Sequence, residues 1–258
     1  MSALHAGEPA RGPASARLKA RLAGGLYVVT IAAGMFALSV RAQLTVRGDA
    51  AATARHILDS QAIYRAAMAA DILGIVAYVG VTAILYELLA PVSRTLSLTA
   101  AALSLVGCAV GAAILALVAA PLLLLAGQAS LPAFSPAELQ TMALTSLRLH
   151  DRGYDFGMVF FGFYCLLLGY LTFRSGFFPR WLGLLLALTG TAWLAGSLGD
   201  VLAPALSARM NPYIDLAGLL GEGALTLWLL AVGLDGGRWA ELAGTAPGRS
   251  AVELRRPL

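Results

Sequence analysis

The residues of this chain that could do chemistry are ionisable side chains inside long apolar segments. Glu222 lies about halfway along the last such segment, on one helical stripe with Asp215, Gly218 and Thr226. A carboxyl group at the middle of a bilayer is costly, so ionisable residues there usually face the interior of a helix bundle and serve a function. We therefore expect Glu222 to contact a ligand or a proton.

Three other apolar segments carry similar polar stripes. Their candidate site residues are Asp71 and Tyr78, then His150, Tyr154 and Asp155, and finally Asp200. Most of these groups lie toward the same end as Asp215, which suggests the rim of an outward-facing polar cavity with Glu222 at its floor. The alternative is structural: Asp71 would pair with Arg65 or Arg152, and the other groups would be solvated among lipid headgroups.

Composition identifies the elements that position these residues. The chain has 258 residues, of which 59% are hydrophobic and 12% charged, whereas a soluble domain has about 25% charged residues. A bilayer core needs about 20 helical residues, and backbone groups in lipid must be bonded internally, so helices are expected. The sequence predicts an all-α polytopic bundle of six transmembrane helices, near 22–41, 65–89, 96–126, 152–174, 179–202 and 212–234. Residues 22–234 would form one membrane domain between disordered tails at 1–21 and 235–258.

Two polar segments before spans predict short amphipathic helices on the outer face. Residues 49–64 open with Asp49 as a cap, and residues 135–148 open with Ser135 followed three residues later by Glu138, a capping box. Interfacial helices are the main interpretation, and lids over a site are the alternative. Pro121 is expected to kink the third span or end it early.

Arginine placement bears on orientation. If the N-terminus is cytoplasmic, the short segments on the two sides carry equal numbers of basic residues. Further basic residues before the first span and at the end of the chain favour cytoplasmic N- and C-termini. Arg174 and Arg180, beside the turn after the fourth span, would then anchor the inner face, with anionic-lipid contact as a functional alternative.

No metalloprotease, P-loop, paired-cysteine or hydrolase motif is found in the sequence. His5 lies in a tail and His56 in a loop helix, which leaves His150 with Asp155 or Glu222 as the remaining combination for a metal. The sequence therefore predicts no metal and no cofactor. It also predicts no nucleic-acid partner, because no basic run is interleaved with aromatic residues.

Several segments together resemble a bacterial membrane family catalogued as domain of unknown function 4386. The matching stretches are "GGLYVVTIAAGMFA", "GDAAATARHIL", "YELLAPVSRTLSL", "MVFFGFYCLLLGYLTFRSGFFPRWLGLLLALTG" and "GEGALTLWLLAVG". The resemblance implies a six-span bacterial protein, with the cytoplasmic membrane as its expected location, and implies no activity. The chain departs from the expected pattern at "AVGLDGGR", where Arg238 would anchor the sixth span a turn late.

Three functions remain open at this point. The leading one is binding or transport of a small molecule or a proton, with Glu222 supplying the charge. The second is an intramembrane enzyme in which His150 and a carboxylate, Asp155 or Asp71 rather than Glu222, act as acid and base. The third is a non-catalytic assembly or envelope-stress protein in the bilayer. The sequence does not give an oligomeric state.

Overall fold

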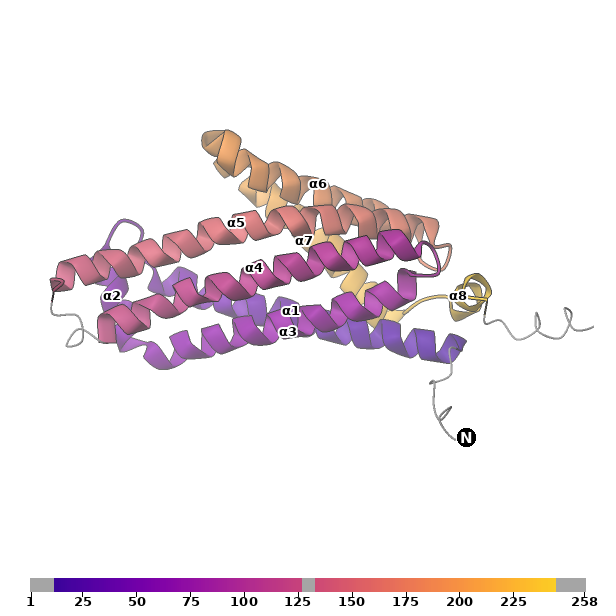
Figure 1. Ribbon diagram of the computed structural model, residues 1–258, viewed down its shortest axis with the longest axis horizontal. Helices are drawn as coiled ribbons and strands as arrows, with labels where there is room; N and C mark the ends of the chain where they lie inside the picture. Colours follow the sequence, from indigo (N-terminus) through magenta and orange to yellow (C-terminus); the bar gives the residue numbers. More distant parts are fainter. Residues whose placement is uncertain (1–11, 127–132, 245–258) are drawn as a thin grey trace, which may run out of the picture.

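The computed structural model describes residues 12–126 and 133–244, except for a few side chains near the start of the seventh helix, Asp215 among them. The described part is a bundle of long helices with two short ones at its ends (Figure 1). The helices are α1 (Pro13–Leu44), α2 (Ala50–Asp59), α3 (Gln61–Leu89), α4 (Arg94–Ala126), α5 (Pro136–Arg174), α6 (Arg180–Leu202), α7 (Pro204–Ala231) and α8 (Gly236–Leu242). Figure 1 shows α6 leaving the long axis of the bundle at an angle, whereas α4 and α5 run side by side.

Five helices of the described part, α1, α3, α4, α5 and α6, are long and apolar enough to cross a bilayer. A sixth candidate is formed by the second half of α7 together with α8, two segments that meet at a bend of 100°. The structure thus confirms the predicted fold class, an all-α polytopic membrane bundle. Because the long helices alternate in direction, the start of α1 and the ends of α3, α5 and α7 lie at one end of the molecule, where α8 also lies (Figure 1).

The predicted helix at 135–148 is not a separate amphipathic element. Ser135 and Glu138 do form the expected capping box, but the helix that they start runs without a break to Arg174. Gly153 lies within this helix, and Ile114 of α4 packs against it in the space that a side chain would fill. Residues 152–174 are therefore the second half of one 39-residue helix. Residues 49–64 also differ from the prediction, since α2 ends at Asp59 and Gln61 already begins α3.

Two expected tails are partly helical. α1 begins at Pro13, nine residues before the predicted span start at 22, with proline in the first turn, where its missing N–H costs nothing. α8 occupies 236–242 within the expected C-terminal tail, capped by the Asp235 carboxylate. α4 also continues to Ala126, so Pro121 does not end the third span early.

Glycine residues allow α5 and α6 to pack backbone against backbone. A Cβ atom built on Gly183 would lie 2.6 Å from the carbonyl oxygen of Gly169, and one on Gly190 would lie 2.6 Å from that of Gly162. Gly162 and Gly169 are seven residues apart on α5, and Gly183 and Gly190 are seven residues apart on α6. Each helix therefore contacts the other along one stripe of small residues. Small residues play this role widely in membrane bundles.

α8 ties several helices together at its end of the bundle. The chain turns after α7 at Gly233, whose φ of +78° favours glycine. The indole N–H of Trp239 then donates to the carbonyl of Leu88 near the end of α3 (2.9 Å). Lys19 of α1 and Glu87 of α3 form an ion pair at the same end.

Candidate functional site

Four helices bring polar side chains together around Glu222 of α7. The Tyr78 hydroxyl of α3 donates to Glu222 Oε1 at 2.8 Å, and the Tyr27 hydroxyl of α1 donates to the same oxygen at 3.0 Å. The two hydroxyl oxygens are 3.4 Å apart, and the two rings meet edge to face. We call Tyr27, Tyr78, Tyr164 and Glu222 the tyrosine–glutamate cluster.

The fourth member, Tyr164 of α5, packs its ring against that of Tyr78 with centroids 6.2 Å apart. Its hydroxyl is buried and makes no hydrogen bond of ordinary geometry with any residue that the structure describes. A cavity of about 10 Å³ lies beside Tyr164, about the volume that one water molecule needs. Two hydroxyls of the cluster therefore donate to Glu222, and the third, on Tyr164, does not.

Close packing of α7 explains why Glu222 reaches the tyrosines. A Cβ atom on Gly24 of α1 would lie 2.9 Å from the Leu230 backbone nitrogen, so α1 and α7 touch there. About two and a half turns earlier on α7, Gly221 lies against Thr189 of α6, whose hydroxyl donates to the Ala217 carbonyl (2.7 Å). These two contacts fix the rotation of α7, so the residue after Gly221 points between α1 and α3.

The cluster lies deep in the bundle. Glu222 is nine residues before the end of α7 at Ala231, and Tyr164 is ten residues before the end of α5 at Arg174. At about 1.5 Å per residue these separations correspond to about 14–15 Å, half the thickness of a bilayer core. Tyr27, Tyr78 and Tyr164 are at most 7% exposed. Within the described part of the chain, no arginine, lysine or histidine forms an ion pair with Glu222.

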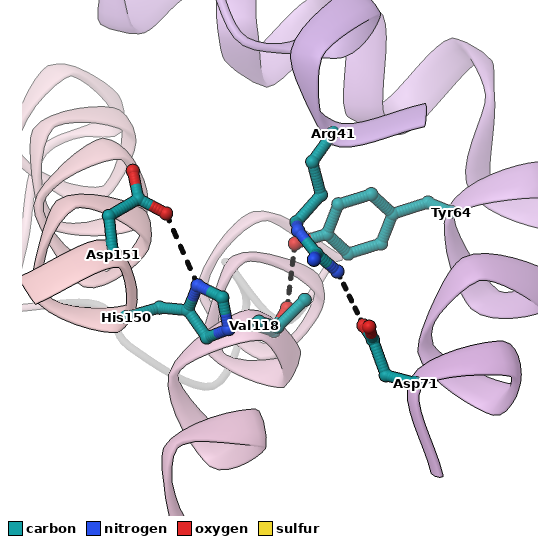
Figure 2. A network of polar contacts seen from close by, with 6 residues as sticks. All are labelled: Arg41, Tyr64, Asp71, Val118, His150 and Asp151. Carbon is teal, nitrogen blue, oxygen red and sulfur yellow. Dashed lines mark hydrogen bonds and ion pairs between the residues drawn. The ribbon is translucent and has the colours of Figure 1, made fainter. Parts of the chain in front are cut away.

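Asp71 belongs to a different group, nearer the opposite end of the bundle. It pairs with Arg41 of α1, not with Arg65 or Arg152 as the structural alternative had it. Figure 2 shows Arg41 reaching across to Asp71 beside the ring of Tyr64. The Tyr64 hydroxyl donates to the Val118 carbonyl of α4 at 2.7 Å, which links α3 to α4. Both ionised side chains are largely buried, with 16% and 13% of their surfaces exposed.

His150 is buried on α5, and its Nδ1 lies 3.2 Å from the exposed carboxylate of Asp151 (Figure 2). Among the described contacts of His150, none joins it to Asp71, Asp155 or Glu222. The acid–base pairs considered for an enzyme are thus not assembled in this conformation.

The other expected rim residues lie apart from the tyrosine–glutamate cluster. Asp155 is 3.7 Å from Arg152 and also interacts with the half-buried Asp200 of α6. Two neighbouring carboxylates repel each other unless a cation or a proton lies close, and the Arg152 guanidinium, 61% exposed, offsets this repulsion only in part. Tyr154 is 55% exposed, and the side chain of Asp215 lies outside the described residues.

The polar stripes therefore serve mainly as helix contacts. Gly218, on the stripe of Glu222, packs against the indole of Trp193, and Gly74, on the stripe of Asp71, packs against Thr30 and Ala33 of α1. The structure brings Tyr78 and Glu222 together among the predicted site residues, and Asp155 with Asp200, but distributes the rest over separate groups. Tyr27, Tyr164 and Arg41 were not among the predicted site residues.

Arg174 and Arg180 are both exposed near the turn between α5 and α6. The Arg180 guanidinium lies 5.5 Å from the centroid of the Phe173 ring. Neither residue lines the pocket described below, whereas three other arginines at this end do. Across the described ranges, no group of three or more histidine, cysteine or acidic residues is arranged to hold a metal ion.

The fold and these polar groups define a multi-pass membrane protein with a partly buried carboxyl group inside its helix bundle. The family model described as "Domain of unknown function (DUF4386)" matches residues 22–233, and the chain belongs to this family. The chain is also similar to a protein of Archaeoglobus fulgidus described as uncharacterized, with 32% identity over 79 residues. That alignment covers 31% of this chain and 45% of the relative, so the chain spans less than half of the relative's length. No solved structure matches the chain.

Proposed function

We propose that this protein binds, and exchanges across the membrane, a proton or a small cation at the tyrosine–glutamate cluster. The observation that carries the proposal is the convergence of two buried tyrosine hydroxyls on one oxygen of Glu222, with no cationic side chain paired to it among the described residues. Hydroxyl donors stabilise an ionised carboxylate, whereas apolar packing and lipid oppose an uncompensated charge. Because the hydroxyls favour the ionised form of Glu222 and the apolar surroundings oppose it, a proton or a cation that binds there neutralises the carboxylate.

The arrangement of donors also favours exchange over a fixed structural role. A structural carboxylate in lipid is normally neutralised by a permanent partner, as Asp71 is by Arg41. Glu222 has neutral partners, and both donate to Oε1, which leaves its other oxygen available. The Tyr164 hydroxyl lies in the same cluster, near those of Tyr27 and Tyr78, and in this proposal supplies a further ligand for a cation or a bound water.

We place the protein in the bacterial cytoplasmic membrane, with both termini in the cytoplasm. The start of α1 and the end of α8 lie at the same end of the bundle, which supports a common side for the two termini. The basic residues of α1 near this end, Arg17, Lys19 and Arg21, support the cytoplasmic side by the positive-inside rule. An outward-facing path would then approach Glu222 from the end that holds Asp155 and Asp200.

The test is proton flux into proteoliposomes that contain a pH-sensitive dye, after a pH gradient and a counter-ion path are imposed. The wild-type protein is expected to dissipate the gradient, and Glu222→Gln is expected to abolish that flux. The matched control is Glu241→Gln, which changes an exposed carboxylate on α8. Repeating the assay with a gradient of sodium ions at equal pH on both sides distinguishes cation exchange from proton exchange.

A stability measurement accompanies the flux assay. Glutamine keeps a carbonyl oxygen that accepts both tyrosine hydroxyls, so Glu222→Gln is expected to melt at or above the temperature of the wild type in the same detergent. A variant that melts far lower, or that carries the wild-type flux, would contradict the exchange role and make Glu222 a structural residue.

A further inference from the structure

A second polar feature lies at the end of the bundle where α8 folds back. An open pocket of about 490 Å³ is formed there by α1, the turn between α5 and α6, the end of α7 and the start of α8. Its volume is in the range of pockets that hold small organic ligands, about 300–1,000 Å³. None of its lining residues belongs to the tyrosine–glutamate cluster.

The charge of the pocket is positive. Arg17, Arg21 and Arg238 line it together with one acidic residue, Asp235, which gives three positive charges against one negative. Arg17 and Arg21 are four residues apart on α1, so their side chains lie on one face of that helix. Both are exposed, and neither has an ion pair among the described residues.

Arg238 is held at the rim of this pocket. Its Nη1 donates to the Gly176 carbonyl at 3.0 Å, and its Nε lies 3.5 Å from the Asp235 carboxylate. Asp235 is fixed in turn, because its carboxylate also caps the first turn of α8. The one acidic group among the lining residues is thus occupied by Arg238 and by backbone N–H groups, so within the described ranges the charges of Arg17 and Arg21 have no paired carboxylate.

The remaining wall is apolar and aromatic. It includes Phe177, Phe178 and Trp228, the last of which stacks edge to face on Trp181 with ring centroids 5.7 Å apart. Aromatic side chains of this kind gather where a membrane protein meets the headgroup layer. A ligand that fits this pocket carries an anionic group for the arginines and an apolar part for the aromatic wall.

We propose that this pocket binds the phosphate group of an anionic phospholipid, with the guanidinium groups of Arg17 and Arg21 as the phosphate contacts. Guanidinium groups bind phosphate oxygens in a bidentate manner. A zwitterionic phospholipid would bind these arginines more weakly, because the cation of its own headgroup lies close to the phosphate. The apolar wall then contacts the glycerol and the upper acyl chain. The site differs from Arg174 and Arg180, which are exposed outside the pocket.

The test compares lipid binding by the full-length protein and by an Arg17→Gln/Arg21→Gln double variant. Delipidated protein in detergent is titrated with phosphatidylglycerol or phosphatidylcholine and followed by native mass spectrometry. The wild type is expected to prefer phosphatidylglycerol. Each basic residue at a membrane surface strengthens binding to anionic lipid about fivefold, so the double variant is expected to bind phosphatidylglycerol about thirtyfold more weakly. Arg17→Lys/Arg21→Lys keeps the charge and should retain part of the preference.

The matched control is Arg47→Gln/Arg55→Gln, which removes two exposed arginines at the other end of the bundle. It should leave the preference for phosphatidylglycerol unchanged. The melting temperature in phosphatidylcholine, where the pocket contributes little, shows whether each variant is folded. Equal loss in both double variants would overturn the proposal, because it would indicate a general charge effect.

Inorganic phosphate supplies the same anionic group without the lipid. It is added alone as a second ligand, with the melting temperature as the readout. The lipid assignment predicts stabilisation by phosphatidylglycerol that phosphate does not reproduce and that depends on Arg17 and Arg21. Stabilisation by phosphate equal to that by phosphatidylglycerol would overturn the lipid assignment and indicate a soluble phosphate compound.

Discussion

At the scale of single residues, Asp71 and Glu222, two partly buried carboxyl groups of the bundle, have opposite surroundings. Asp71 lies against a cation, Arg41, on the neighbouring helix, and both side chains are largely buried. Glu222 lies against two neutral hydroxyls at a similar degree of enclosure. The carboxylate of Asp71 therefore pairs two helices, whereas in our proposal the carboxyl group of Glu222 binds a proton or a cation reversibly.

This difference predicts the effect of neutralising Asp71. Asp71→Asn leaves the Arg41 guanidinium buried without a counter-charge, so the free energy of unfolding is expected to fall by about 3–5 kcal/mol. The measurement is thermal unfolding in one detergent. The control is Arg152→Gln, which breaks an exposed pair with Asp155 and should cost less than about 1 kcal/mol.

A double variant makes the Asp71 prediction sharper. Arg41→Met/Asp71→Leu replaces both buried charges by apolar groups, and such replacements are often neutral or stabilising. The double variant should therefore recover most of the stability that Asp71→Asn loses. A double variant as unstable as the single one would show that the loss comes from packing rather than from an unpaired charge.

At the scale of helices, hydropathy predicted the apolar segments well, because each residue's preference for lipid is a local property. The places where helices end were harder to predict. Ser135 and Glu138 gave a clear start signal for α5, but the polar run from His150 to Asp155 resembled a boundary and is continuous helix. The neighbouring helices contact this run at Gly153, against Ile114 of α4, and at Asp155, beside Asp200 of α6, which the local sequence does not reveal.

Contacts between helices were the least predictable part of the site. Tyr27 occurs in an apolar run with no charged neighbour at helical spacing, so nothing local distinguishes it from a packing residue. Its role depends on Gly24 and Gly221, which bring α1 and α6 against α7. Its depth was not visible either, because Tyr27 is only the sixth residue of the predicted span at 22–41, whereas it lies near the middle of α1 as the structure has it, Pro13–Leu44.

The glycine contact between α5 and α6 yields a prediction at this scale. Gly183→Ala would place a methyl group 2.6 Å from the Gly169 carbonyl oxygen and 2.7 Å from the Phe173 backbone nitrogen, so the two helices must separate. Overpacking of this kind costs about 1–3 kcal/mol. The matched control is Gly34→Ala on α1, which has no atom within 4 Å and should be neutral or stabilising.

Thermal unfolding of the two glycine variants in the same detergent measures this difference. The expected order of melting temperatures is Gly34→Ala at or above the wild type, and Gly183→Ala below it. Equal melting temperatures for the two variants would mean that α5 and α6 are not in backbone contact.

At the scale of the whole molecule, the fold separates three polar regions along the membrane normal. The arginine pocket lies at the end with α8, the tyrosine–glutamate cluster lies near the middle, and the pairs of Asp71 and Asp155 lie toward the other end. If the proposed orientation is correct, the arginine pocket faces the anionic lipids of the cytoplasmic leaflet, and a cation from outside first meets acidic side chains. The topology therefore decides which leaflet the arginine pocket faces, whereas the cluster near the middle can exchange a proton or a cation in either orientation.

Two exposed threonines allow this topology to be tested without changing any charge. Thr95 lies in the first turn of α4, at the end with α8, and Thr141 lies in the second turn of α5, at the other end. Each is changed to cysteine separately, and the native Cys108 and Cys165 are buried, so they add little background. A membrane-impermeant maleimide should label Thr141→Cys in right-side-out vesicles and Thr95→Cys in inverted vesicles. Labelling of both positions from one side would contradict the bundle itself, because an odd number of crossings separates them, whereas the reverse pattern would keep the fold and place the arginine pocket on the outer face.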